Sequence, residues 1–262
     1  MTEAVFERDG ERYLPTKLAG SPWGDDMVHG GPPAGLLARA IESLGATAEL
    51  RVVRLTVDLF RPVPKVPLTV QARSVREGKR IHAVDAVLLA DGVEVSRASG
   101  LLLRSTELPE VKAGGSLLPP PGPESAEERP IIPPRDARPR REGFHTASEF
   151  RRLPRAETGP AATWIRVPEL VAGERMTPLV RLAATCDFVN AVGSMTSQGG
   201  GAGFINTDVT VYVSREPVGE WICLQVERTI EPDGIGVGGA TIFDREGGVG
   251  RAVQALLANP MR

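Results

Sequence analysis

The feature that most constrains the fold of this chain is an internal repeat. At an offset of 154 residues, positions 56–103 align without a gap with positions 210–257 and share 12 identities in 48 positions. Average residue usage would give about three identities. The identical pairs include Thr56/Thr210, Arg61/Arg215, Gln71/Gln225, Ile81/Ile235, Arg97/Arg251 and Leu102/Leu256. The sequence therefore predicts two copies of one folding unit.

Each copy is predicted to be one helix followed by four strands. The first helix starts at Pro32-Pro33, and the second runs from Pro178 to Gly193, with proline suited to a first turn and glycine to an end. Alternating or apolar runs predict strands at 51–60, 68–76, 81–89 and 93–104, then at 204–214, 221–230, 236–243 and 250–258. Shorter strands are expected at 11–16, 149–153 and 161–167. Turn signals between successive strands indicate antiparallel hairpins, so the predicted class is α+β.

The composition changes between the two copies. Nine prolines lie between residues 105 and 143, and four arginines (Arg135, Arg138, Arg140 and Arg141) follow near the end of this stretch. We predict an N-terminal domain at 1–104, a Pro/Arg-rich linker at 105–143 and a C-terminal domain at 144–262. The arginines fit a solvated face and also a contact with a nucleotide phosphate, and the sequence leaves both interpretations open.

Composition excludes several classes of partner. The chain of 262 residues is 41% hydrophobic and 24% charged, with a formal net charge of -2, which offers no general attraction to nucleic acid. We expect no membrane span and no secretory leader, and hence a cytoplasmic protein. Its two cysteines lie in apolar segments and are expected to be free thiols. Assembly into a homo-oligomer is compatible with the sequence and is not determined by it.

One carboxylate stands out in the second predicted helix. Asp187 lies in an otherwise apolar stretch, and a carboxylate there needs partners, which makes it a functional candidate. Exposure of Asp187 to solvent, or ordinary hydrogen bonds that cap a helix, would also explain a carboxylate at this position. The offset of 154 places Pro33 opposite Asp187 and Gly100 opposite Gln254, so the repeat predicts that only the second copy carries these polar groups.

Several motifs together resemble a known family. They are His29-Gly30-Gly31-Pro32-Pro33-Ala34, Phe60-Arg61-Pro62-Val63, Cys186-Asp187-Phe188 with Asn190, Phe204-Ile205-Asn206-Thr207-Asp208, Arg215 to Trp221, and Gln254. With the repeat, they make the chain similar to the bacterial acyl-CoA thioesterase II-like family. The resemblance implies a double hotdog fold, in which each antiparallel sheet wraps around a helix, and covers nearly the whole chain apart from the linker.

The resemblance also implies a site. In that family an Asp, a Thr-like residue and a Gln hold the attacking water, and by position these map onto Asp187, Asn206 and Gln254. Asn206 departs from the usual Thr, but an amide can also orient water. The resemblance implies hydrolysis of fatty acyl-CoA with no cofactor or metal. His29, Gly30 and Gly31 are the expected substrate-binding residues, because a helix start offers N–H groups to a carbonyl oxygen.

Rival functions are weighed on the same residues. Residues 234–239 match the pattern G-x-G-x-x-G, but the repeat makes this a glycine-containing hairpin and not a dinucleotide site. Neither a zinc spacing nor a G-x-S-x-G elbow occurs, and His82 and His145 are dispersed. Hotdog enoyl-CoA hydratases resemble this chain in placing an acid and an Asn close together, as Asp187 and Asn190 are. The resemblance implies a nearby histidine as well, but Ala191, Val192 and Gly193 follow here, which argues against a hydratase. A non-catalytic acyl-CoA-binding module is the alternative from a different class, since it would keep the pocket without the three polar residues.

Overall fold

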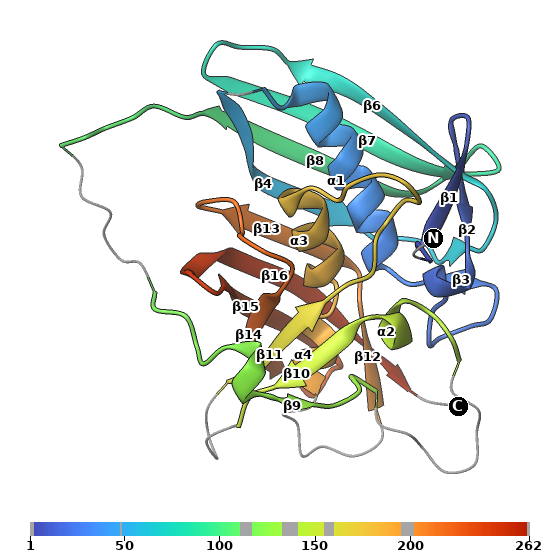
Figure 1. Cartoon of the computed structure of the whole chain (residues 1–262). Coiled ribbons are helices and arrows are strands. Elements are labelled where there is room, and N and C mark those ends of the chain that lie inside the picture. Colours follow the sequence, from blue (N-terminus) through green and yellow to red (C-terminus); the bar gives the residue numbers. More distant parts are fainter. Residues whose placement is uncertain are drawn as a thin grey trace.

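The computed structural model describes residues 3–47, 49–110, 117–132, 141–154, 160–194 and 202–260. Within them a 14-stranded sheet follows the order β1-β2-β6-β7-β8-β4-β13-β16-β15-β14-β11-β10-β9, with β12 paired to β16. All of its strand pairs are antiparallel. The helices lie against one side of this sheet (Figure 1). This is the predicted α+β architecture.

The strands fall into two sets along the chain. The first set comprises β1 (Phe6–Asp9), β2 (Arg12–Pro15), β3 (Met27–Val28), β4 (Leu50–Asp58), β5 (Val63–Pro64), β6 (Leu68–Arg76), β7 (Ile81–Ala90) and β8 (Val93–Arg104). The second comprises β9 (Glu127–Glu128), β10 (Glu149–Arg152), β11 (Ala161–Arg166), β12 (Ala202–Asn206), β13 (Asp208–Val213), β14 (Ile222–Ile230), β15 (Ile235–Asp244) and β16 (Gly247–Pro260). The strand β3 pairs with β5 in a separate small sheet. The residues around the G-x-G-x-x-G pattern form β15, as the repeat predicted.

The two halves join where β4 meets β13. Their register pairs Thr56 with Thr210, and the two hydroxyl oxygens lie 3.2 Å apart. These are also the residues that the offset of 154 makes equivalent, so a local two-fold axis passes through this pair. On either side, Val57 pairs with Val209 and Leu55 with Val211. The symmetry inferred from the sequence is thus present in the backbone.

The sequence separation of the two helices differs from the separation of 154 residues found for the strands. The pairs β6/β14 and β7/β15 begin and end 154 residues apart, but the helix starts at Gly31 and Pro178 are only 147 apart. The ungapped match of Pro33 with Asp187 is therefore wrong. Aligning the helix starts places Ala40 opposite Asp187, which is again a residue without a carboxylate.

Four helices are described. They are α1 (Gly31–Gly45), α2 (Phe144–Ala147), α3 (Pro178–Cys186) and α4 (Val189–Ser194), with short 3-10 turns at Lys17–Ala19 and Pro123–Ser125. The helix α1 packs on β4, β6, β7 and β8, while α4 packs on β14, β15 and β16, and α3 lies along α1. None of these helices is long and apolar enough to span a membrane.

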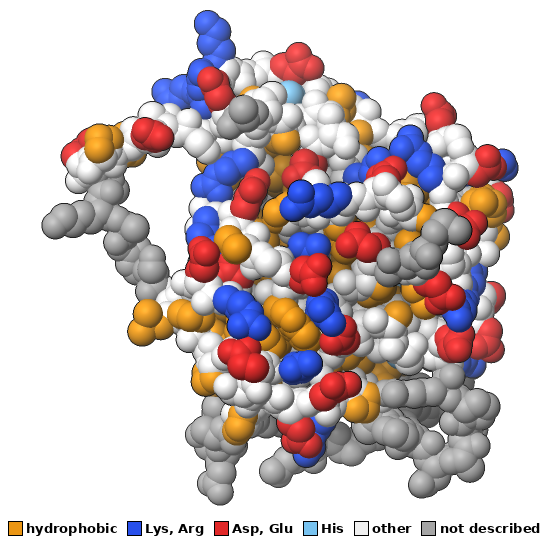
Figure 2. Space-filling model, viewed as in Figure 1, with side chains coloured by type: hydrophobic (Ala, Val, Ile, Leu, Met, Phe, Trp, Pro, Cys, Tyr) orange, Lys and Arg blue, Asp and Glu red, His pale blue; other side chains and the backbone are white. Residues whose placement is uncertain are grey.

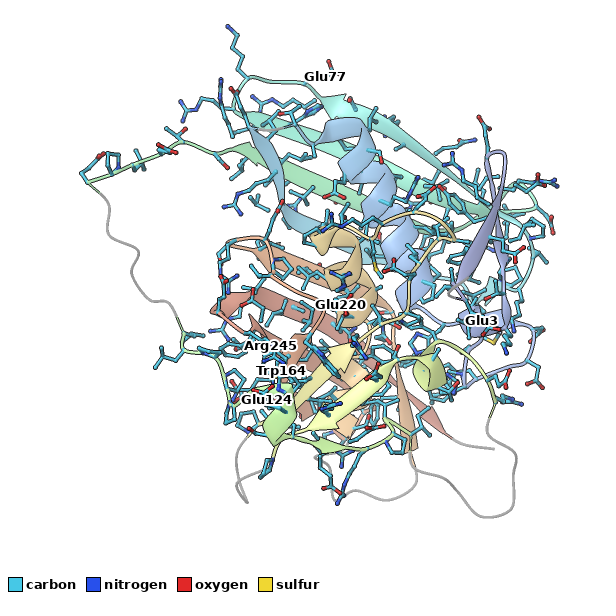
Figure 3. All side chains as sticks on the ribbon, in the orientation of Figure 1. Glu3, Glu77, Glu124, Trp164, Glu220 and Arg245 are labelled. Atoms are coloured by element: carbon cyan, nitrogen blue, oxygen red, sulfur yellow. The ribbon has the colours of Figure 1, made fainter. Side chains whose placement is uncertain are left out.

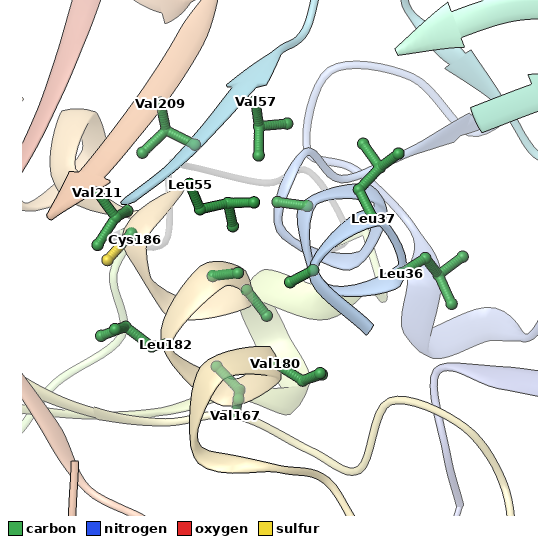
Figure 4. Packing of buried hydrophobic residues seen from close by; sticks show 14 of the residues in the cluster. Leu36, Leu37, Leu55, Val57, Val167, Val180, Leu182, Cys186, Val209 and Val211 are labelled. Carbon is green, nitrogen blue, oxygen red and sulfur yellow. The ribbon is translucent and has the colours of Figure 1, made fainter. Parts of the chain in front are cut away.

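The core fills the space between the helix pair and the central strands. The buried cluster includes Leu36 and Leu37 of α1, Leu182 of α3, and Leu55 and Val57 of β4 (Figure 4). All five of these side chains are almost fully buried. Val209 and Val211 of β13 complete this cluster. Full burial of such a side chain stabilises the fold by about 1.5–3 kcal/mol, so the central strand pair anchors both helices.

Two predicted elements are interrupted in the structure. The single helix expected at 178–193 is two helices, because α3 ends at Cys186 and α4 begins at Val189. The single strand expected at 204–214 divides at Thr207 into β12 and β13. Both interruptions lie beside the polar residues that the resemblance singles out.

Part of the predicted linker lies on the C-terminal half of the sheet. The indole N–H of Trp164 donates to the carbonyl of Pro121 at 2.8 Å, and Arg245 pairs with Glu124 at 2.9 Å. Figure 3 shows Trp164, Glu124 and Arg245 together at this end of the molecule. Of the arginine cluster, Arg135, Arg138 and Arg140 lie outside the described residues, and Arg141 pairs with Asp25 at 2.8 Å. Over the face seen in Figure 2, basic and acidic side chains are interspersed.

The Arg215 to Trp221 motif has a structural explanation. Arg215 forms a two-pronged ion pair with the fully buried carboxylate of Asp244, which also accepts hydrogen bonds from the N–H groups of Val218 and Glu246 at 2.8 Å. Burial acts to raise the pKa of Asp244, but the bonds from Arg215 and the backbone outweigh it and lower that pKa. The ionised carboxylate thus ties the loop before β14 to the end of β15.

This arrangement predicts a pH-dependent effect of Asp244→Asn. Because the folded-state pKa of Asp244 is lowered, its contribution to stability is fully present above the ordinary aspartate pKa of about 3.9 and is lost as pH falls through the folded value. We expect urea unfolding at pH 7 to show a loss of about 1–3 kcal/mol, which shrinks below about pH 4. Asp85→Asn, which breaks an exposed ion pair with Arg73, is the control and should change little. Equal losses for Asp244→Asn at pH 7 and pH 3 would contradict the assignment.

Candidate active site

Asp187 lies at the break between α3 and α4 and is only 6% exposed. One of its carboxylate oxygens, Oδ1, accepts a hydrogen bond from Asn206 Nδ2 at 2.8 Å. The other, Oδ2, is 2.9 Å from His29 Nδ1. The structure thus brings together the predicted catalytic residues Asp187 and Asn206 with the predicted binding residue His29. These residues come from the break after α3, from β12 and from the position two before α1.

Gln254 explains why the helix breaks here. In a continuous helix the N–H of Asn190 would bond to the carbonyl of Cys186. Instead, Gln254 Oε1 accepts from the Asn190 N–H at 3.0 Å, while its Nε2 donates to Cys186 O at 3.0 Å and Asp187 O at 3.4 Å. A side chain inserted into the hydrogen-bond ladder is a known cause of helix interruption. Gln254 is fully buried and holds the backbone on both sides of Asp187; a bond from Gln254 to water stays a prediction.

Two glycines allow the carboxylate to approach the start of α1. A Cβ atom on Gly30 would lie 2.7 Å from Asp187 Oδ1 and 2.9 Å from Oδ2. A Cβ on Gly31 would lie 2.6 Å from the carbonyl oxygen of Ala184. Any side chain at either position would push α1 away from α3. The positive end of the α1 dipole is therefore held against Asp187, where it favours negative charge.

Aromatic residues to which the sequence analysis gave no role in the site surround His29. The ring centroids of Phe144 and Phe188 lie 5.4 and 5.0 Å from that of His29, and the ring of His145 stacks at 6.1 Å. The phenyl rings of Phe144 and Phe188 also stack on each other. The sequence analysis left His145 aside because it follows the linker, and no spacing in the chain links residue 145 to residue 29. Only the position of α2 beside the start of α1 brings them together.

Asn190 and Asp208 have local structural partners. Asn190 Nδ2 donates to Phe204 O at 2.6 Å, and its Oδ1 has no hydrogen-bond partner among the described residues. Asp208 Oδ1 accepts from the N–H of Ala255 at 2.7 Å. Thr207, between Asn206 and Asp208, is exposed. These contacts fix the ends of β12 and β13, on which Asn206 depends for its position.

The cysteine next to Asp187 is not a nucleophile. Burial raises the pKa of the Cys186 thiol far above its ordinary value, and the charge of Asp187 adds to this effect. Burial likewise raises the pKa of Cys223 to about 12. Both thiols are free and buried. Among the described residues, no group of three or more His, Cys, Asp or Glu side chains could hold a metal ion.

A cavity of about 60 Å³ lies at the far end of α1 from Asp187 and is lined in part by Glu42, Leu179, Leu182 and Val213. Glu42 accepts a hydrogen bond from Thr177 at 2.6 Å there, and burial raises its pKa. The 15 residues of α1 separate this cavity from Asp187 by about 20 Å.

Comparison with known proteins decides the family. A model of the acyl-CoA thioesterase N-terminal domain matches residues 19–103, and a model of the C-terminal domain matches residues 121–258. The chain belongs to the acyl-CoA thioesterase family. It is therefore a thioester hydrolase, as the sequence predicted. A search of curated proteins gave no significant match.

Solved structures of distant sequence share the fold of this thioesterase. The tesB protein of Mycobacterium avium subspecies paratuberculosis is 15% identical, with 97% of this chain and 96% of that chain covered and a TM-score of 0.71. A protein of unknown function with a hot dog fold from Alicyclobacillus acidocaldarius is 17% identical, with 98% and 96% covered and a TM-score of 0.70. The acyl-CoA thioesterase II TesB2 of Mycobacterium marinum is 14% identical, with 100% and 95% covered and a TM-score of 0.65. The predicted double hotdog fold is confirmed.

The role of Gln254 in the helix break can be tested by Gln254→Leu. This change keeps the approximate volume and leaves the N–H of Asn190 and the carbonyl of Cys186 buried without their partner. We expect a loss of about 1–3 kcal/mol in the free energy of unfolding in urea, with a further loss of thioesterase activity as Asp187 shifts. Gln225→Leu, on β14 of the same sheet, removes an amide for which no hydrogen bond is described and is the matched control. Equal stability of both variants would contradict the proposed clamp.

The burial of both thiols predicts that the native enzyme resists thiol reagents. Ellman's reagent should give no rapid colour with the folded protein and two equivalents of thiol after unfolding in guanidinium, because the thiolate is the reactive form. Rapid reaction of a native thiol would show that Cys186 or Cys223 is exposed. The result matters for assays that detect released CoA through its thiol.

Proposed function

We propose that this thioesterase hydrolyses fatty acyl-CoA to CoA and a free fatty acid, using a water molecule that Asp187 activates. The observation that carries the proposal is the buried carboxylate of Asp187, held by Asn206 and His29 against the start of α1. A carboxylate fixed in this way is a suitable general base. The two free, buried thiols fit a reducing compartment such as the cytoplasm.

The proposed reaction needs no covalent intermediate. The water oxygen forms a bond to the thioester carbonyl carbon while one water proton passes to the Asp187 carboxylate. The carbonyl oxygen becomes an oxyanion, which the N–H of Gly31 at the start of α1 stabilises. The C–S bond then breaks, and the CoA thiolate takes the proton back from Asp187. Cys186 has no part in this scheme, because its buried thiol stays protonated.

The other polar residues have supporting roles in this proposal. Asn206 donates to one oxygen of Asp187, and its own side-chain oxygen is the group that can accept a bond from the water. Gln254 is a positioning residue, since its amide holds the backbone on both sides of Asp187. His29 fixes the second carboxylate oxygen. Each role follows from a contact to Asp187 or to its backbone.

Hydration of an enoyl-CoA is a second candidate, favoured by one observation. The sequence argument against it was that no histidine follows Asn190, but the structure supplies His29 at 2.9 Å from Asp187. That argument is therefore wrong. An imidazole and a carboxylate in contact can serve as acid and base in adding water across a double bond. The two reactions differ in product, since only thioester hydrolysis releases a thiol.

We expect a series of acyl-CoA substrates of increasing chain length to release CoA, measured through its free thiol. Asp187→Asn should lower kcat by about 100-fold or more, because an amide cannot accept the water proton. Asp208→Asn is the matched control, since that carboxylate is on the adjoining strand and contacts only the N–H of Ala255 among the hydrogen bonds described. Circular dichroism should show that both variants fold.

The same assay separates the alternatives. Full activity of Asp187→Asn would overturn the assigned base, and binding of acyl-CoA without turnover by the wild-type protein would overturn the proposed reaction. Appearance of 3-hydroxyacyl-CoA from an enoyl-CoA, without thiol release, would favour the hydratase.

A further inference from the structure

His29 Nδ1 has two polar neighbours that make opposite demands on it. It lies 2.9 Å from Asp187 Oδ2 and 3.2 Å from the backbone N of Gly31. To bind an ionised carboxylate, the ring nitrogen must carry a proton and donate it. To bind the Gly31 N–H, the same nitrogen must be unprotonated and accept. One nitrogen satisfies only one of these partners at a time.

The contact with Asp187 is the stronger of the two. A hydrogen bond to a charged acceptor is shorter and about twice as strong as one between neutral groups, which agrees with the 2.9 and 3.2 Å separations. The ring is also held in place, because the side chain is only 11% exposed and packs against both Phe144 and Phe188. An ionised Asp187 therefore selects the form of His29 with a proton on Nδ1.

This choice leaves the Gly31 N–H without an acceptor at the start of α1. A helix normally presents several free N–H groups in its first turn. Here the next two residues are Pro32 and Pro33, which have no N–H, and the N–H of Ala34 is bonded to Gly30 O at 3.2 Å. Among residues 31 to 34, Gly31 is therefore the one with a backbone N–H that is available to bind a ligand.

We propose that His29 is a positioning residue that links the two parts of the active site: by donating Nδ1–H to Asp187, it frees the Gly31 N–H to bind the thioester carbonyl oxygen. The inference rests on the proposed function, in which Asp187 is the base. In this proposal the imidazole of His29 has two effects. It orients Asp187, and it leaves the Gly31 N–H free to donate to the oxyanion. His29 itself does not touch the reacting atoms.

The protonated nitrogen of His29 can be observed directly. The chain has three histidines, so a long-range ¹⁵N–¹H NMR spectrum of the whole protein is simple, and His29→Asn assigns the signals of residue 29. We expect Nδ1 of His29 to carry a proton in the free enzyme at neutral pH. An unprotonated Nδ1 would show that it accepts from Gly31, and this would overturn the proposal.

Three substitutions then test which atom matters. An asparagine amide places an N–H near the position of the histidine Nδ1, whereas a glutamine amide reaches toward the position of Nε2. His29→Ala and His29→Gln should lower kcat by about 100-fold with a smaller change in KM, as expected for a misplaced base. His29→Asn should retain most of kcat. Loss of activity by His29→Asn equal to that of His29→Ala, or unchanged activity of His29→Ala, would overturn the proposal.

A double variant separates this inference from the proposed function. If His29 acts through Asp187, the combination of His29→Ala with Asp187→Asn should be no slower than Asp187→Asn alone. A slower double variant would show that His29 acts independently and would overturn its positioning role. Full activity of Asp187→Asn would instead overturn the proposed base, whatever the result at residue 29.

Discussion

The pairing of β4 with β13 is the interaction on which the rest of the molecule depends. It joins the two half-sheets into one, and its local two-fold axis at Thr56 and Thr210 sets the helices antiparallel to each other. The start of α1 at Gly31 meets the end of α3 at Ala184, and the end of α1 at Glu42 meets the start of α3 at Thr177. The proposed active site lies where the helix start of one half meets a carboxylate of the other.

Symmetry gives two such meeting points, and only one of them brings together the residues of the proposed active site. At one end of the helix pair lie Asp187, Asn206 and His29. At the other end, Glu42 caps the start of α3 through Thr177 beside a small cavity. The main difference is Gln254, which interrupts α3 at Asp187, while Gly100, its equivalent in the first half, has no side chain to interrupt α1. A single glutamine therefore distinguishes the interrupted helix of the second half from the continuous α1 of the first.

The sequence predicted the fold well and the site in part. The repeat and the alternation of apolar residues located the main strands, because the pairing of neighbouring strands obeys local rules. The break at Asp187 could not be read from the apolar pattern of 178–193, since its cause, Gln254, is more than 60 residues away in the chain. The contact of His29 with Asp187 crosses between the two halves and has no signal in spacing. The predicted alignment of the two helices was wrong because the repeat contains a gap, and no identical residues lie near this gap to reveal it.

The two prolines at the start of α1 determine what kind of group this helix can bind. A phosphate has several oxygens and is best held by several backbone N–H groups at once, as in nucleotide-binding loops. Because Pro32 and Pro33 in its first turn have no N–H, α1 cannot hold a phosphate with several adjacent donors, and it offers a donor suited to one oxygen atom. The proposed substrate carries both an acyl carbonyl and the phosphates of CoA. With a single donor beside Asp187, the start of α1 suits the carbonyl oxygen of that substrate better than its phosphates.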